Sequence, residues 1–219
     1  AGLPRRGRLD EAQALELFSA LGVATVESVR ARAPRFEHEL PYPVAAKILS
    51  RDIAHKTEAG GVALGISGRS QYDESVRAML AAVAASRPAA RIDGIIVQRM
   101  EVGLAEVIVG YRHDALVGPL VLLGAGGILA EIYADYALRL APVSEEEAAE
   151  MIAEVKGLAT LRGYRNLPRG DLAALAHAVA ALSRLALMKG QPVAEAEINP
   201  LIVKRSGVVA VDGLVVMKE

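Results

Sequence analysis

The sequence contains no cysteine and no tryptophan, and aromatic residues make up only 4% of its 219 residues. The absence of cysteine excludes disulfide bonds and thiolate chemistry, and it is compatible with a cytoplasmic protein. Hydrophobic residues nevertheless make up 53% of the chain, so alanine, valine and leucine must fill the core. A chain of this length can form one large domain or two small lobes, each with a core of its own.

An excess of charge of one sign and long apolar runs are missing too. The formal net charge is −1, so nothing indicates a nucleic acid or a membrane surface as a partner. No apolar run reaches the ~18 residues of a membrane-spanning helix, and no signal peptide is recognisable. Residues 1–8, AGLPRRGR, resemble a linker or an expression remnant. We therefore expect the sequence to be a domain taken from a longer protein.

A stretch of alternating apolar residues gives the clearest structural signal. At residues 42–49, YPVAAKIL, a period of two places Lys47 on a strand that is otherwise apolar. Residues 62–66, VALGI, predict a second strand. The segment between them is polar and cannot continue the first strand. The pattern therefore predicts a β-hairpin with a flexible loop.

The loop of this predicted hairpin, residues 50–61, has a composition that suits phosphate binding. It contains His55 and Lys56 and ends in Gly60 and Gly61. Glycines allow backbone N–H groups to approach an anion closely, and lysines supply positive charge. One interpretation is a hairpin that covers a phosphate group. The other is an ordinary hairpin with a solvated loop, because short motifs also occur by chance.

The rest of the chain shows the pattern of an α+β protein. Helices are predicted at residues 10–21, 72–86, from 144 onward and 171–188, and strands at 23–29, 94–100, 104–111, 119–123, 193–203 and 208–211. The strands between residues 94 and 123 follow one another without helices, so a doubly wound sheet is the weaker interpretation. The GAGG segment at 124–127 lacks the GxGxxG spacing of a dinucleotide site with an acidic residue ~20 positions on.

The last predicted hairpin carries a second group of polar residues. Glu195, Glu197 and Asn199 alternate along its first strand, so their side chains share one face. Asp212 follows the returning strand. Carboxylate and amide oxygens are hard ligands that suit Mg²⁺, which keeps several waters and takes nucleotide phosphates as further ligands. The alternative is an ordinary solvated hairpin face. Together with Lys47, the hairpin predicts a site for a nucleotide and a metal ion.

Several stretches resemble one protein family. YPVAAKILSRDIAHKTEAGGVALGI is similar to the nucleotide-binding part of the NDP-forming acyl-CoA synthetases, and GIIVQRM, EVIVGYRHDALVGPLVLLGAGGILAEI, RLAPVS and EAEINPLIV resemble further parts in the same order. The similarity covers nearly the whole chain from Leu9 onward. The combination of HKTEAGG with EINP is far more specific than either motif alone.

The resemblance implies an α+β protein with the ATP-grasp fold, in which two lobes hold a nucleotide between them. Residues 9–93 would form the first lobe with the phosphate-covering hairpin, and residues 94–219 the second lobe with the metal-binding hairpin. The implied reaction joins an acid and coenzyme A at the expense of ATP, and it yields acyl-CoA, ADP and phosphate through an acyl phosphate and a phosphohistidine.

The resemblance also implies roles for individual residues. The lysine on the first strand would contact the nucleotide phosphates, and the two glycines would close over them. Backbone groups of residues 98–101 would read the adenine, and an acidic residue would lie near the ribose and the phosphates. The residues implied in binding ATP or ADP are Lys47, Gly60, Gly61, Gln98, Met100, Glu101 and Glu106.

Metal binding and catalysis are implied at four positions. Asn199 and Asp212 match the ligands of Mg²⁺. Glu197 stands where this branch commonly has aspartate, and we expect it to orient a phosphohistidine. His55 matches the histidine proposed to relay a phosphoryl group in related two-component synthetases. Imidazole suits this role, because near neutral pH it retains a nitrogen that can accept a phosphoryl group. The alternative for His55 is a loop histidine bonded to the backbone.

The implied partners are a CoA-binding domain and a domain with the main phosphohistidine, either fused to this chain or in a separate subunit. The chain would then be a β-type subunit or part of a fused enzyme. Two other functions remain open. One is a regulatory ATP-grasp module of a protein-lysine acetyltransferase. The other is a carboxylate–amine ligase, which shares the ATP-grasp fold but does not explain HKTEAGG.

Overall fold

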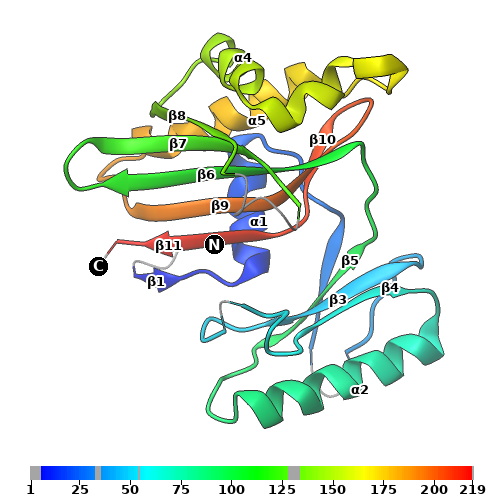
Figure 1. The fold of residues 1–219 in the computed structure, drawn as a ribbon. Helices are drawn as coiled ribbons and strands as arrows, with labels where there is room; N and C mark the ends of the chain where they lie inside the picture. The colour runs from blue at the N-terminus through cyan, green and yellow to red at the C-terminus, as the bar shows by residue number, and fades with distance from the viewer. Residues whose placement is uncertain (1–5, 33–35, 54, 128–133, 219) are drawn as a thin grey trace. The chain divides into compact units, whose positions relative to one another are not determined.

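The computed structural model describes residues 6–32, 36–53, 55–127 and 134–218. The chain divides into two compact units (Figure 1). The larger unit consists of Ala1–Leu9, Gln13–Thr25 and Val102–Glu219, and the smaller unit of Asp10–Ala12 and Val26–Glu101. Each unit has its own sheet, and the strands within both sheets pair antiparallel. The fold class is therefore α+β, as the sequence predicts.

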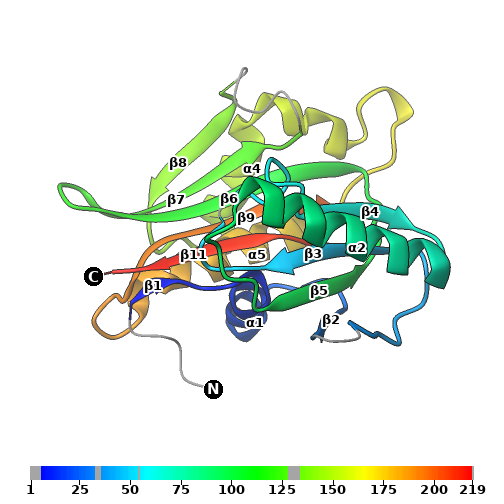
Figure 2. The same cartoon turned by 90° about the horizontal axis from the view of Figure 1, so that it is seen from below.

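The smaller unit is a four-stranded sheet with one helix on it. In spatial order its strands are β2 (Ser28–Ala31), β5 (Gly94–Arg99), β3 (Val44–Leu49) and β4 (Val62–Ile66), and the helix is α2 (Arg69–Ser86). The predicted hairpin of β3 and β4 is confirmed. Figure 2 shows α2 lying along this sheet. Apolar residues of α2 at helical spacing, among them Tyr72, Val76 and Met79, are buried in the same core as residues of β3.

The two faces of β3 differ, and this difference positions Lys47. Val44, Ala46 and Ile48 belong to the core that α2 covers. Lys47 alternates with them and therefore lies on the opposite face. It is nevertheless buried, with 7% of its surface exposed. Because a buried cation is costly unless it is paired, Lys47 must have a partner on that face.

The larger unit is built on a seven-stranded sheet. Its strands are β1 (Gly7–Arg8), β11 (Gly213–Met217), β9 (Val193–Val203), β6 (Ala105–Asp114), β7 (Gly118–Ala125) and β8 (Tyr136–Leu140) in spatial order, with β10 (Val208–Ala210) paired to β9. Its helices are α1 (Glu11–Leu21), of which Gln13–Leu21 belongs to this unit, α4 (Glu145–Glu154) and α5 (Leu172–Ser183). Among the described residues, no helix is both long and apolar enough to cross a membrane.

Helices α4 and α5 cover one side of the larger sheet (Figure 1). Helix α4 begins with a capping box, in which Ser144 and Glu147 bond to each other's backbone N–H groups. Helix α5 contacts β6 and β7, and its small alanine side chains allow this close packing. Its last residue, Ser183, is fully buried and accepts a hydrogen bond from the backbone of Val143.

The structure differs from the sequence-based prediction at several boundaries. The sequence places residues 94–99 in the second lobe, but β5 pairs with β2 and β3 and so belongs to the smaller unit. The sequence places α1 in the first lobe, but most of this helix belongs to the larger unit. A strand predicted at 23–29 is found at Ser28–Ala31, and the helix predicted to reach residue 188 ends at Ser183. Strand pairing over long distances decides these boundaries, and local patterns do not report it.

Asp171 fixes α5 to the hairpin of β9 and β10. Its side chain accepts hydrogen bonds from the N–H groups of Ala174 (2.9 Å) and Gly207 (2.7 Å), and its own N–H donates to the carbonyl of Lys204 at 2.9 Å. The first contact makes Asp171 the N-cap of α5. These donors, Ala174 first and Gly207 second, lower the pKa of the Asp171 carboxyl below its ordinary value of 3.8.

We predict that Asp171→Ala lowers the free energy of unfolding by about 1 to 2 kcal/mol near neutral pH, because a cap and a loop contact are lost. A carboxyl with a lowered folded pKa stabilises the fold above its unfolded pKa, and the stabilisation disappears as the pH falls through the folded pKa. The difference between wild type and variant should therefore shrink below about pH 4.

Urea unfolding of both proteins across pH 2.5 to 7 measures this difference. Asp171→Asn is the matched control, since an amide caps a helix but does not titrate in this range. A difference that stays constant down to the lowest pH would contradict the assignment.

Candidate functional site

Lys47 pairs with a carboxylate that the sequence analysis does not identify. Its Nζ lies 2.8 Å from Oε1 of Glu11, which is the first residue of α1. The side chain of Glu11 is 0% exposed. Nζ of Lys56, from the hairpin loop, lies 2.7 Å from Oε2 of the same carboxylate. Gln98 Nε2 donates to Glu11 Oε1 at 3.2 Å. We call these four residues the Glu11 cluster, and all four belong to the smaller unit.

The backbone register explains why these side chains meet. On β5, Gln98 lies directly opposite Ala45 of β3, so it shares the face that carries Lys47. Glu11 and Lys56 reach this face from outside the sheet. Sequence analysis misses Glu11 because it lies 36 residues from Lys47 along the chain and its position at the start of a helix is ordinary for a glutamate. No local signal distinguishes it.

The hairpin loop is held at two points and exposes His55 between them. Ile53 and Ala59 are buried in the core of the smaller unit, with 5% and 2% of their surface exposed. His55 is exposed, and its carbonyl accepts a hydrogen bond from Ala59 N–H. The polarity and glycines of this loop predict a flexible segment. Instead, two apolar side chains and the ion pair of Lys56 anchor it.

The two glycines of this loop serve close packing in the described conformation. Gly60 has a φ of +74° and Gly61 lies against β3, where an added Cβ would meet side-chain atoms of Ile48 at 2.7 Å. Their N–H groups donate within the loop, to the carbonyls of Thr57 (3.0 Å) and Lys56 (2.7 Å). A role of these two amides in covering a phosphate therefore requires a rearrangement of the loop.

Residues 98–101, at the end of β5 and directly after it, are expected to bind adenine. The backbone of Gln98 lies in β5 between β2 and β3, and its side chain belongs to the Glu11 cluster. Met100 N–H donates to the carbonyl of Pro43 at 3.2 Å. Glu101 is the last residue of the smaller unit. The side chain of Gln98 thus has a defined partner inside the protein, which the sequence does not reveal.

Three predicted residues meet at the start of the last hairpin of the larger unit. Asn199 Nδ2 donates to Glu197 Oε1 at 3.0 Å, as expected for side chains on one face of β9. Asn199 N–H donates to the carbonyl of Asp212 at 3.3 Å, which brings these two residues together. Glu106 is exposed on the neighbouring strand β6, and its carbonyl accepts a hydrogen bond from Gly126 N–H at 2.9 Å.

The donors of this hairpin fit a hard divalent cation such as Mg²⁺, because they are carboxylate and amide oxygens. In the part of the chain that the structure describes, no three His, Cys, Asp or Glu side chains are grouped closely enough to hold a metal ion. Mg²⁺ keeps water or phosphate ligands and seldom occupies a site made only of protein groups.

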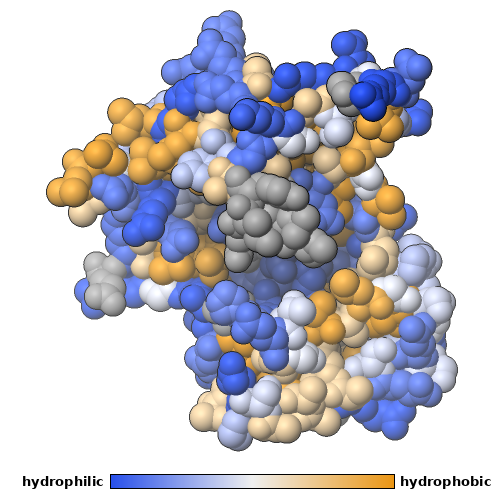
Figure 3. Space-filling view, in the orientation of Figure 1, coloured by the Kyte–Doolittle hydropathy of each residue, from blue (hydrophilic) through white to orange (hydrophobic). Residues whose placement is uncertain are grey.

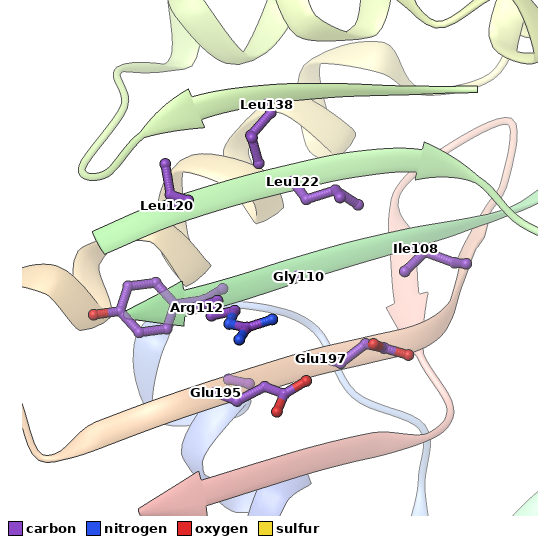
Figure 4. Close-up of a pocket in the computed structure, with 10 residues that line it drawn as sticks. Ile108, Gly110, Arg112, Leu120, Leu122, Leu138, Glu195 and Glu197 are labelled. Atoms are coloured by element: carbon purple, nitrogen blue, oxygen red, sulfur yellow. The ribbon is translucent and has the colours of Figure 1, made fainter. Parts of the chain in front are cut away.

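A pocket of about 190 Å³ lies on the face of the larger sheet that carries Glu197 (Figure 4). Leucines of β7 and β8 line one side, and Glu195, Glu197 and Arg112 line the other. Gly110 lies opposite Glu197 in the strand register and leaves space above the sheet because it has no side chain. Exposed apolar residues lie along β8 and in the turn before β7: Leu116, Val117, Leu138 and Leu140. Figure 3 shows an apolar area over the larger unit.

The packing of Gly61 gives a prediction for the loop. Gly61→Ala should lower the free energy of unfolding by about 1 to 3 kcal/mol, because its methyl group would overlap the buried side chain of Ile48. Ile48→Val shortens that side chain, so the double variant should be less destabilised than the sum of the two single changes. Gly110→Ala is the control, since its Cβ meets only an ordinary contact at 3.7 Å.

Chemical denaturation of the four variants measures these effects. Strict additivity of Gly61→Ala and Ile48→Val would show that the glycine is not required for contact with β3.

Comparisons with known proteins identify the family of this chain. A family model described as an ATP-grasp domain matches residues 3–217. An ADP-forming acetate–CoA ligase of Archaeoglobus fulgidus is 35% identical over 97% of this chain, but only 31% of that protein is covered. The β subunit of an ADP-forming acetate–CoA ligase of Pyrococcus furiosus is also 35% identical, over 95% of this chain and 91% of the subunit.

A solved structure agrees with these relatives. The acetyl-coenzyme A synthetase 1 of Ca. Korarchaeum cryptofilum, in complex with coenzyme A and Ca-AMPCP, superposes with a TM-score of 0.90 at 31% identity. The superposition covers 97% of this chain and 94% of that chain. This chain thus spans about a third of a fused ligase and nearly all of a separate β subunit. It belongs to the ATP-grasp domain family, in the branch formed by the ADP-forming acyl-CoA ligases.

Proposed function

We propose that this chain is the nucleotide-binding part of an ADP-forming acyl-CoA ligase. It binds ATP or ADP with Mg²⁺ and passes a phosphoryl group through His55. The observation that carries the proposal is the arrangement of the β3–β4 hairpin, in which Lys47 and Lys56 meet at one carboxylate and the exposed His55 precedes Lys56 in the chain. The relatives named above are ligases, and none of them is an acetyltransferase, so the regulatory alternative is not proposed.

The smaller unit supplies the positive charge of the proposed site. Lys47 and Lys56 bring two ammonium groups to this site, and ammonium groups bind anionic phosphate oxygens through charge-assisted hydrogen bonds. An ammonium group has three N–H donors, so it can bind more than one oxygen at the same time. In this proposal, Lys47 contacts a phosphate oxygen from its place beside Glu11. Such a contact is charge-assisted and short, which orients the phosphate chain.

The larger unit supplies the oxygen ligands. Asn199 and Asp212 would hold Mg²⁺, and Glu197 orients the amide of Asn199 through their hydrogen bond. The bound cation would neutralise charge on the phosphate oxygens. Glu106 would lie near the ribose and phosphates. The oxygen atoms that these roles require are present on the last hairpin of the larger unit and on β6.

The proposed chemistry at His55 is a phosphoryl transfer. A neutral imidazole nitrogen attacks the γ-phosphorus of ATP. An N–P bond forms while the bond from phosphorus to the bridging oxygen breaks, and ADP leaves with the electron pair. Lys56, next in the chain, stabilises the charge on the transferred oxygens. Most of the rate comes from positioning and charge neutralisation, since the reaction needs little other help from the protein.

The partners in this proposal are a CoA-binding domain and a domain with the main phosphohistidine. Both would belong to the same enzyme, fused or as a separate subunit. The carboxylic acid and coenzyme A would bind mainly there. The phosphoryl group would pass from His55 to that phosphohistidine, and from it to the acid as an acyl phosphate.

Nucleotide binding can be tested at Lys47. Lys47→Met keeps the apolar stem and removes a charge-assisted phosphate contact worth roughly 1.5 to 3 kcal/mol, so the affinity for Mg-ADP should fall about 10- to 150-fold. Calorimetric titration of wild type and variant gives the dissociation constants. Lys189→Met, at an exposed lysine of the larger unit, should leave them unchanged. Equal affinities for wild type and Lys47→Met would remove Lys47 from the site.

The role of His55 can be tested in the enzyme completed with its other domains. His55→Ala should abolish acyl-CoA formation and keep the Mg-ADP affinity within about threefold, because the residue accepts the phosphoryl group but does not anchor the nucleotide. Asn199→Ala and Asp212→Ala should weaken Mg-ADP binding itself. His113→Ala is the control, since His113 bonds to Gln191 on another part of the larger unit. Wild-type rates in His55→Ala would overturn the relay.

A further inference from the structure

The carboxylate of Glu11 bonds to both lysines of the hairpin. Its two oxygens are divided between them. Oε1 accepts from Lys47 of β3 at 2.8 Å, and Oε2 accepts from Lys56 of the loop at 2.7 Å. The side chain of Glu11 is 0% exposed, and those of Lys47 and Lys56 are 9% and 13% exposed.

This contact connects three elements that are distant in sequence. Glu11 begins α1, Lys47 lies in β3, and Lys56 lies in the loop next to His55. A carboxylate removed from water needs such partners, because an unpaired buried charge is strongly unfavourable. The same bond that satisfies Glu11 therefore fixes the position of the loop residue beside His55.

We propose that Glu11 is a positioning residue that holds the His55 loop in place through Lys56 and aligns the ammonium group of Lys47. The inference deepens the proposed function and rests on it. Glu11 does not touch the nucleotide in this scheme. It acts through the two lysines, and its effect on catalysis passes through the loop.

The proposal has a physical consequence for nucleotide binding. A phosphate group that reaches Lys56 competes with Glu11 for the same ammonium group, because both are anions that bind its N–H donors. Lys56 can then exchange a bond to the carboxylate for a bond to the phosphate. In this scheme Glu11 holds Lys56 without nucleotide and a phosphate holds it with nucleotide, and the position of His55 depends on which anion holds Lys56.

The neighbouring Asp10 provides a matched control. It is buried like Glu11, with 5% and 3% of their surfaces exposed. It also forms an ion pair with a strand of the smaller unit, but with Arg30 of β2 at 3.2 Å. Asp10→Asn and Glu11→Gln therefore remove the same charge from adjacent buried positions, and only the second removes the carboxylate that binds Lys56.

Hydrogen–deuterium exchange of the nucleotide-free 219-residue chain tests the proposal. The loop amides of residues 59–61 donate within the loop, so their exchange reports its opening. Glu11→Gln should speed their exchange about tenfold or more and change the amides of β5 less than about threefold. Lys56→Gln should reproduce the loop effect, and the double variant should add little to it. Asp10→Asn should leave the loop unchanged.

The rate of phosphoryl transfer to His55 gives the second readout. In the enzyme completed with its other domains, single-turnover labelling from [γ-³²P]ATP should slow about tenfold in Glu11→Gln because His55 is no longer held in position. Glu11→Asp keeps the charge on a shorter side chain, which cannot span both lysines. It should show the same loop opening with better folding, and it replaces Glu11→Gln if that variant does not fold.

Three outcomes would overturn the proposal: unchanged loop exchange in Glu11→Gln and Glu11→Asp, equal acceleration in the loop and in β5, or the same loop opening in Asp10→Asn. The hydrogen–deuterium exchange measurement is independent of the proposed function, because it is made without nucleotide. Absence of any protection by Mg-ADP in the wild-type chain would count against the proposed function and leave the result for Glu11 in place.

Discussion

A charge can lie inside a protein only where opposite charges and hydrogen bonds replace the water that it loses. The face of β3 opposite α2 meets this requirement with one carboxylate, two ammonium groups and an amide. The smaller unit depends on this arrangement, because its sheet would otherwise bury Lys47 among apolar side chains. Removing one member leaves the others without part of their compensation, so the four residues should behave as one energetic unit.

Polar side chains are arranged differently at the hairpin of the larger unit that carries Asn199. Its polar groups lie at the surface of the sheet, where Asn199 and Glu197 bond to each other and where the backbone joins Asn199 to Asp212. The buried side of the same strand holds Ala196 and Ile198 in the core. The period of two thus places Ala196 and Ile198 on the buried face of β9, and Glu197 and Asn199 on the other face. If the proposed function holds, a substitution of Glu197 or Asn199 should disturb binding more than stability.

Much of this could be predicted from the sequence, because the relevant patterns are local. Alternation along residues 44–49 places Lys47 on the face opposite the apolar core, and alternation along β9 puts Glu197 and Asn199 on one face. The cap of α5 at Asp171 follows from its position before an alanine-rich helix. In each case, neighbouring residues carry the whole signal.

The remaining features depend on contacts between distant parts of the chain. Glu11 is 87 residues from Gln98 and 45 from Lys56, so no window of sequence contains the cluster. The loop glycines indicate a close approach but do not say to what. Sequence reasoning assigns them to a phosphate, whereas in the structure Gly61 approaches Ile48. The assignment of β5 to the smaller unit is likewise decided by its pairing with β2 and β3.

The anchors of the loop limit how far His55 can travel. Ile53 and Ala59 lie on either side of His55 and are buried in the core of the smaller unit. Full burial of an isoleucine side chain stabilises a protein by about 1.5 to 3 kcal/mol, so a movement that carried Ile53 into water would cost about that amount. The exchange of Lys56 from Glu11 to a phosphate needs no such exposure. A relay in which His55 shifts between its anchors, and the partner's histidine approaches it, therefore costs less than a relay in which the whole loop leaves the core.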